Sequence, residues 1–190
     1  MPNQEIEIKF RVQNLREITH RLRKNGFRLI TARTHEMNTL YDLKGQPLRK
    51  RSDLLRLRKY GSEWTLTYKA KGKAGSHKTR IELETKISDG KKMEAILLAL
   101  GFLPSFRYEK FRAEWSDGKG NVVLDETPIG NFGEIEGKSR WIDRVARTLE
   151  IPVGNYIKQS YTELFYDWKK RTRSSALEMT FKAARSGKRI

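Results

Sequence analysis

The chain contains short stretches in which a charged side chain recurs at every second position. Three of them read Glu5-Ile-Glu-Ile-Lys9, Arg56-Leu-Arg58 and Arg80-Ile-Glu-Leu-Glu84. Arginine and lysine bind phosphate oxygens, whereas carboxylates bind hard divalent cations such as Mg²⁺ or Mn²⁺, which bridge to phosphate. Both sets on one surface therefore predict a site for a divalent cation together with a polyphosphate group.

The alternation recurs in seven segments, with apolar residues at the intervening positions. Residues two apart in a strand share one face, so the charged residues would gather on one side of a sheet. The basic positions are Lys9, Arg56, Arg58, Lys69, Lys71, Arg80, Lys110 and Arg112. The acidic positions are Glu5, Glu7, Glu82, Glu84, Glu114, Asp125, Glu134 and Glu136.

Two interpretations of this face are open. It is either the solvated face of an antiparallel sheet, or the inner face of a barrel that encloses a charged ligand while helices cover the apolar outside. Buried charge is costly unless it is paired or ligand-bound. The density of ionised groups, and the presence of both signs on one face, favour the barrel.

The strand and helix patterns indicate how these residues are positioned. Strand patterns cover residues 4–12, 29–42, 54–59, 64–71, 79–87, 106–115, 121–125 and 132–137. Helix patterns cover residues 13–25, 89–100, 139–150 and 160–171, and Gly45-Gln46-Pro47 marks a turn. The strands are not the all-apolar kind found in parallel sheets, and helices interrupt groups of strands. We expect an α+β fold with an antiparallel sheet or barrel and helices outside.

Composition excludes several classes of protein. The chain has 190 residues and no cysteine, which fits one domain and rules out disulfides, thiol catalysis and Cys-ligated metals. No apolar run approaches the roughly 20 residues that span a bilayer, and the N-terminus carries carboxylates where a signal peptide would be apolar. We expect no membrane contact and a cytoplasmic location.

The net charge of +17 predicts an anionic partner. Residues 169–190 contain eight basic residues and one acid. We therefore expect a domain over residues 1–168 and a basic tail over 169–190, disordered or helical. Contact of this tail with polyphosphate or RNA is an alternative to a purely solvated end.

The charged motifs also occur in a known order. Glu5-x-Glu7-x-Lys9 is followed by Arg56-x-Arg58, Lys69-x-Lys71, Arg80-x-Glu82-x-Glu84, Lys110-x-Arg112, Asp125 and Glu134-x-Glu136. In this order the chain resembles the CYTH superfamily, or triphosphate tunnel metalloenzymes, over about residues 4–166. That group includes class IV adenylyl cyclases, thiamine triphosphatases and inorganic triphosphatases. The resemblance implies an eight-stranded antiparallel tunnel with a charged lumen, a bound triphosphate, a Mg²⁺ or Mn²⁺ cofactor and a homodimer.

The resemblance also implies roles for individual residues. Implied metal ligands are Glu5, Glu7, Asp125, Glu134 and Glu136, with Glu82 and Glu84 completing the shell. Implied phosphate-binding residues are Lys9, Arg56, Arg58, Lys69, Lys71, Arg80, Lys110 and Arg112. Implied catalytic residues are Glu5, Glu7, Lys9 and Glu84. Tyr41 stands where some relatives have an assisting tyrosine, and a core role is the alternative.

The function expected is an enzyme, a metal-dependent triphosphatase that acts on inorganic triphosphate first and thiamine triphosphate second. The second acid of Arg80-x-Glu82-x-Glu84 favours hydrolysis, and no purine pocket is recognisable in the sequence. The alternatives are a class IV adenylyl cyclase, which makes cyclic AMP and pyrophosphate from ATP, and a non-catalytic polyphosphate- or RNA-binding module. A binding module would not require the full set of carboxylates.

Overall fold

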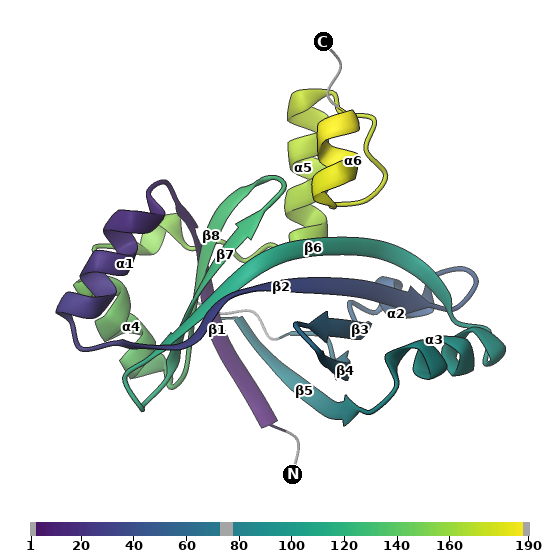
Figure 1. Ribbon diagram of the computed structural model, residues 1–190, viewed down its shortest axis with the longest axis horizontal. Coiled ribbons are helices and arrows are strands. Elements are labelled where there is room, and N and C mark those ends of the chain that lie inside the picture. Colours follow the sequence, from purple (N-terminus) through teal and green to yellow (C-terminus); the bar gives the residue numbers. More distant parts are fainter. Residues whose placement is uncertain (1–2, 73–77, 188–190) are drawn as a thin grey trace.

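In the computed structural model, which describes residues 3–72 and 78–187, eight antiparallel strands close into a barrel (Figure 1). The order around the barrel is β1-β5-β4-β3-β2-β6-β7-β8. The strands are β1 (Asn3–Val12), β2 (Arg28–Asp42), β3 (Leu54–Tyr60), β4 (Glu63–Lys69), β5 (Lys78–Ile87), β6 (Leu103–Ser116), β7 (Asn121–Thr127) and β8 (Gly130–Glu136). The predicted fold class is confirmed.

The helices lie outside the barrel, as predicted. They are α1 (Leu15–Lys24), α2 (Pro47–Lys50), α3 (Gly90–Ala99), α4 (Ser139–Thr148), α5 (Tyr161–Thr172) and α6 (Phe181–Ser186), with a 3-10 turn η1 at Val153–Asn155. Side-chain caps mark where several of them begin: Asn14 before α1, Asp89 before α3 and Ser160 before α5. No helix in the described ranges combines the length and hydropathy needed to cross a membrane.

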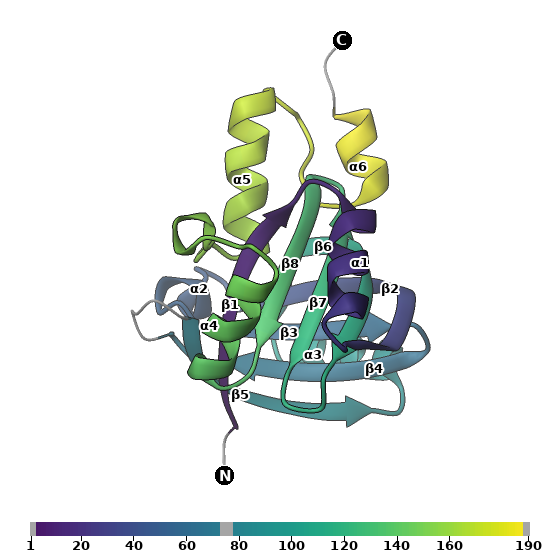
Figure 2. The ribbon, with the colours of Figure 1, turned by 90° about the vertical axis from the view of Figure 1, so that its left-hand side faces the viewer.

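The apolar core lies between the barrel wall and these helices. Phe10, Trp115 and Ile135 of the wall pack with residues of α1 and α4, which flank the β1–β8 side (Figure 2). Tyr41 and Leu57 pack with Leu97 of α3. On most strands alternate residues enter this outer core, and the charged residues between them line the inside of the barrel. On β5 the alternate residues Ile81 and Leu83 are exposed instead. The predicted charged lumen is thereby confirmed.

The C-terminal segment packs against β6. Strand β6 pairs with β7 only from Phe111 onward, which leaves the earlier part of that edge without a strand partner in the described barrel. Met179, which is fully buried, pairs there in parallel with Tyr108, donating to Arg107 O and accepting from Glu109 N. The segment after α5 therefore returns to the barrel wall at Met179, and α6 then rises away from the barrel, as α5 does (Figure 2).

A short helix, α2, occupies the region where only a turn was predicted. The buried Asp42 carboxylate at the end of β2 accepts hydrogen bonds from the backbone N–H groups of Leu48 and Arg49. These bonds satisfy donors at the start of the helix. They also fix α2 beside the end of the barrel where α5 begins.

Candidate active site

The barrel encloses a cavity of 550 Å³ whose wall is predominantly charged. Of the predicted site residues, those that line it are Glu5, Glu7, Lys9, Arg56, Arg58, Lys69, Arg80, Glu82, Glu84, Lys110, Arg112, Glu114, Glu134 and Glu136. Ser160, Tyr161 and Thr162, where α5 begins, also line it. Residues from Glu5 to Thr162 thus meet in one lumen because the barrel closes.

Carboxylates gather on the β1–β8 side of the lumen. Antiparallel pairing places Glu7 opposite Glu136 and Lys9 opposite Glu134. The pKa of Glu136 is raised to about 7, mainly by burial and secondly by the nearby carboxylates of Glu5 and Glu7. The residue still remains accessible to solvent. The structure therefore brings negative charges together at a cost that a bound cation would relieve.

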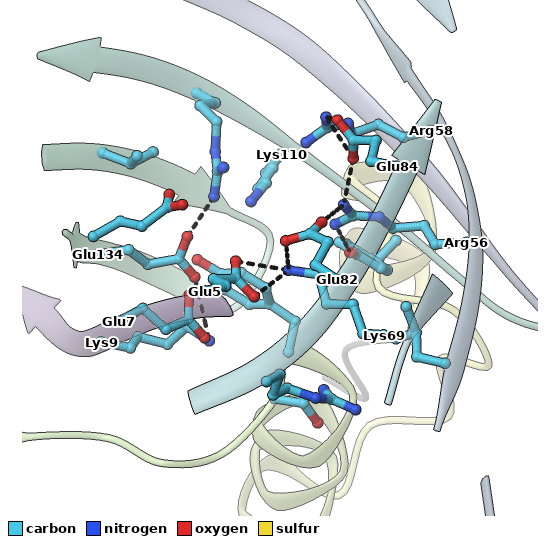
Figure 3. A pocket seen from close by; sticks show the side chains of 18 of the residues that line it. Glu5, Glu7, Lys9, Arg56, Arg58, Lys69, Glu82, Glu84, Lys110 and Glu134 are labelled. Carbon is cyan, nitrogen blue, oxygen red and sulfur yellow. Dashed lines mark hydrogen bonds and ion pairs between the residues drawn. The ribbon is translucent and has the colours of Figure 1, made fainter. Parts of the chain in front are cut away.

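Basic residues of β3 and β4 point into the same lumen. Lys69 Nζ contacts both oxygens of Glu5 at 2.7 Å and one oxygen of Glu82, its partner on the adjacent strand β5, at 3.1 Å (Figure 3). Arg58 donates to Glu84 at 3.0 Å, and Arg56 lies 3.6 Å from the same carboxylate. These ion pairs keep the cations pointing inward without an anionic ligand.

Arg80 and Lys71 behave differently although both were predicted to bind phosphate. The Arg80 guanidinium donates to the carbonyls of Ala70 and Ser52, both at 2.7 Å, and lines the lumen. Strand β4 ends at Lys69, so the alternation does not continue to Lys71. Lys71 is exposed and does not line the cavity; its backbone N–H bonds to Asp53.

Asp125, a predicted metal ligand, is fully buried behind the cavity wall. Its two oxygens accept hydrogen bonds from Arg112 at 2.7 Å each. Lys110, at 2.8 Å, and the hydroxyl of Tyr161, at 2.6 Å, donate to one of the same oxygens. The carboxylate is thus occupied by its own neighbours, and its place in the structure is that of a counter-ion to Lys110 and Arg112.

Glu36 of β2 is a buried acid of the barrel interior that the sequence reasoning missed. Its oxygens lie 3.5 Å from Lys110 Nζ and 3.7 Å from Arg112 Nε, and Asn38 donates to it at 2.9 Å. Burial raises the pKa of Glu36. The cations Lys110 and Arg112 lower it by a larger amount, so that the pKa falls to about 2. Both faces of β2 carry polar residues, so alternation alone did not single it out.

The structure places Tyr41 and two tryptophans outside the lumen. Tyr41 is buried in the outer core, where its hydroxyl donates to Glu94 of α3. Trp115 lies in the core beside α1 and α4, and Trp64 packs against the separate cluster of Tyr41, Leu57 and Leu97. The position of Tyr41 agrees with the core role considered for it.

Lys9 is nearly fully buried and lies 3.3 Å from Glu134. Burial alone would lower its pKa, but the carboxylates of Glu134 and Glu7 raise the pKa of Lys9 above its usual value. Lys9 is therefore a fixed cation in this structure. A proton-accepting role for it would require those carboxylates to be neutralised.

The donor chemistry of the lumen fits a divalent cation. Glu5, Glu7, Glu134 and Glu136 offer the hard oxygen ligands that Mg²⁺ and Mn²⁺ prefer. Within the described part of the chain, no three acids or histidines already stand close enough to hold an ion. Glu5 is held by Lys69, so binding would require this pair to separate.

Three comparisons place this fold among known proteins. A protein of Methanocaldococcus jannaschii provisionally named adenylate cyclase is 29% identical over 171 residues, or 84% of this chain and 97% of the relative. A similarly named Vibrio parahaemolyticus protein has a structure with TM-score 0.78 at 18% identity, covering 87% of this chain and 99% of that one. A Hippeastrum protein provisionally named adenylyl cyclase, with a described dominant triphosphatase activity, has TM-score 0.63 at 19% identity, covering 86% and 95%.

The sequence also matches a family model directly. The match to the CYTH domain covers residues 3–161, from the beginning of β1 to the first residue of α5. It contains all eight strands of the barrel and every lumen residue except Thr162. With the fold, the ordered motifs and this match in agreement, the chain belongs to the CYTH domain family.

Proposed function

We propose that this protein is a metal-dependent phosphohydrolase that removes the terminal phosphoryl group of a triphosphate. The observation that supports it is that one lumen holds acids of β1 and β8 together with basic residues of β3, β4, β5 and β6. The basic residues would neutralise the charge of a triphosphate, and the acids of β1 and β8 would hold the metal. Inorganic triphosphate is the first proposed substrate, since the lumen itself is charged, and thiamine triphosphate is the second.

The proposed roles follow from position. Arg56, Arg58, Lys69, Arg80, Lys110 and Arg112, with Lys9, would bind the non-bridging phosphate oxygens. Glu5, Glu7 and Glu136, with Glu134, would hold a Mg²⁺ or Mn²⁺ ion. The bound cation would supply charge neutralisation at the phosphoryl group. Asp125 and Glu36 would keep Lys110 and Arg112 oriented instead of binding metal.

A carboxylate is better suited than Lys9 to orient the attacking water. Phosphoryl transfer depends mainly on in-line positioning and charge stabilisation. Glu84 is held by the hydroxyl of Thr67 at 2.7 Å and by Arg58, and it lines the lumen. It therefore has a fixed direction and an acceptor oxygen, and we assign this role to it.

The alternative reaction is that of a class IV adenylyl cyclase, in which the ribose 3′-hydroxyl attacks the α-phosphorus and pyrophosphate leaves. The name of the Methanocaldococcus relative favours it, while the described activity of the Hippeastrum protein illustrates that the same fold accommodates triphosphatase activity. Both reactions use the same cations and metal, so the fold does not decide between them.

The deciding experiment incubates the full-length protein with Mg²⁺ or Mn²⁺ and, separately, inorganic triphosphate, thiamine triphosphate or ATP. Phosphate and cyclic AMP are measured in each, beside a Glu5→Gln, Glu7→Gln double variant. Phosphate release that the double variant lacks is the expected result. Cyclic AMP from ATP would move the protein to the cyclase reaction. No turnover, with retained binding of polyphosphate or RNA, would instead support a non-catalytic binding module.

A further inference from the structure

A groove of 700 Å³ lies on the outside of the barrel, between β2, β6 and α6. Lys110 and Arg112 of β6 line the lumen, so Glu109 and Phe111, which alternate with them, face outward into this groove. We call it the side groove. The residues that define it are Arg33 and His35 of β2, Phe111 of β6, and Phe181, Lys182 and Arg185 of α6.

The C-terminal segment forms one wall of the side groove, and Glu109 holds it in place. Phe181 N donates to one oxygen of Glu109 at 2.6 Å, and His35 Nε2 lies 2.8 Å from the other oxygen. The Phe181 and Phe111 rings pack with their centroids 5.5 Å apart. Residues 174–187 lie beyond the matched CYTH domain, which ends at residue 161. This wall is therefore supplied by the part of the chain that follows the family match.

Arg33 and His35 present flat groups to the side groove. The Arg33 guanidinium carbon lies 3.6 Å from the Phe111 ring centroid, and two of its nitrogens donate to Glu126 at 2.6 and 3.2 Å. The His35 ring lies 5.0 Å from the same Phe111 ring. The two side chains are nevertheless 53% and 40% exposed. Each is thus fixed by its neighbours and open to a further flat group, and nucleic acid bases stack on both kinds of surface.

Lys182 and Arg185 supply the positive charge of the side groove. Both are exposed, and within residues 3–72 and 78–187 no acid pairs with either side chain. They are three positions apart, so they lie on one face of α6. Glu109, the acid beside them in the groove wall, is already bonded to His35 and to Phe181 N. The side groove therefore joins two unneutralised cations to flat surfaces.

The positive charge continues beyond the side groove. Helices α5 and α6 stand side by side (Figures 1 and 2), and Ser175 N donates to Gly187 O at 3.1 Å, which joins the far ends of the two helices. The basic residues at that end are Lys169, Lys170, Arg171 and Arg173. A small anion would contact the groove alone, whereas a chain of phosphates would reach both groups of cations.

From this combination we propose that the side groove and the C-terminal helices bind single-stranded nucleic acid. Its bases stack on Arg33 and His35, and its phosphates contact Lys182 and Arg185. Flat groups beside cations suit a chain in which bases alternate with phosphates, whereas a polyphosphate chain would need the cations alone. The lumen lies on the opposite face of β6, so both sites can be filled at once.

The test measures binding of labelled oligoadenylate, as RNA and as DNA, to the full-length protein by fluorescence anisotropy, with inorganic triphosphate present to occupy the lumen. Arg33→Lys keeps the charge but lacks the plane, and it should raise the Kd about tenfold. The double variant Lys182→Ala, Arg185→Ala removes two phosphate contacts. It should reduce the slope of log K against log salt concentration by about 1.4, since each contact to a single strand contributes about 0.7.

The matched control is the double variant Lys91→Ala, Lys92→Ala, which removes the same charge from exposed positions of α3. It should change the Kd less than twofold, and thermal unfolding checks that every variant folds. Tighter binding of RNA or of DNA supports the proposal and identifies the natural strand. The proposal is overturned if no oligonucleotide binds, if the two double variants weaken binding equally, or if Arg33→Lys binds as the unchanged protein does. An equal loss of long-chain polyphosphate binding in Arg33→Lys would also overturn it, because polyphosphate has no ring to stack.

Discussion

Arg112 of β6 and Asp125 of β7 form a two-point ion pair in which Nε and a terminal nitrogen of the guanidinium each lie 2.7 Å from a carboxylate oxygen. Antiparallel pairing sets these two residues directly opposite each other. Lys110 and Tyr161 bind the same carboxylate. One buried acid thus fixes two cations of the lumen and the first turn of α5.

Replacing Asp125 should therefore destabilise the fold strongly. Asp125→Ala leaves Lys110 and Arg112 with less compensating charge, and breaking a buried pair by removing one partner costs about 3–5 kcal/mol. Tyr161→Phe removes one hydrogen bond to a charged group and should cost about 1.5–3 kcal/mol. Urea unfolding measures both. Equal and small losses would contradict the counter-ion role of Asp125.

Glu36 should make stability depend on acid pH. Its folded-state pKa of about 2 lies below the ordinary value of 4.5, so the ionised group stabilises the fold above about pH 4.5. This contribution is lost as pH falls towards 2. Glu36→Gln should therefore be less stable than the unchanged protein at pH 7, by an amount that shrinks below pH 4.5. A difference in unfolding free energy between the two proteins that stays constant from pH 7 to pH 2.5 would contradict this stabilising role of Glu36.

A divalent cation should stabilise the protein. Mg²⁺ or Mn²⁺ would relieve repulsion among Glu5, Glu7 and Glu136, and ligand at 100 times its Kd adds about 2.7 kcal/mol to the unfolding free energy. The temperature midpoint of unfolding should rise with metal concentration. The Glu5→Gln, Glu7→Gln variant should lose the rise, and Na⁺ at equal ionic strength controls for screening. An equal rise in the double variant would place the ion elsewhere.

Lys69 and Lys71 provide a matched pair for testing the lumen. Lys69→Ala removes a cation that lines the cavity, and loss of one such electrostatic contact typically lowers kcat about 10²–10³-fold. Lys71→Ala changes an exposed side chain outside the cavity and should leave kcat/KM within about twofold. Circular dichroism confirms that both fold. Comparable activity losses in the two variants would argue that the substrate extends over Lys71.

The C-terminal segment should contribute to stability instead of behaving as a dispensable tail. Met179 is fully buried against β6, and truncating a buried methionine to alanine costs about 2–5 kcal/mol. Met179→Ala should lose that amount, and a chain ending at residue 173 should lose at least as much. Leu177→Ala, at an exposed position, is the control. Unchanged stability after truncation would support a separate tail from residue 169.

Much of the lumen was predictable because the strand period is two. Once Ile8 and Phe10 enter an apolar core, Glu7 and Lys9 must face the other way. The same rule accounts for the outward direction of Trp64 and Trp115, which alternate with polar residues of their strands. It could not identify Glu36, because His35, Met37 and Thr39 on the opposite face of β2 are themselves mixed in polarity. It could not show that β4 ends before Lys71 either.

The sequence by itself determined which residues of a strand share a face, since side-chain direction along a strand is a local property. Closure of the barrel made the charged face the inner one. Tertiary structure alone decided which inward charges meet. Closure of the barrel set β1 between β5 and β8, and so placed Glu5 beside Lys69 and Glu7 beside Glu136. It also enclosed Asp125 among Lys110, Arg112 and Tyr161. Such pairings join residues far apart in sequence, and their energies depend on distance and burial, which only the folded chain specifies.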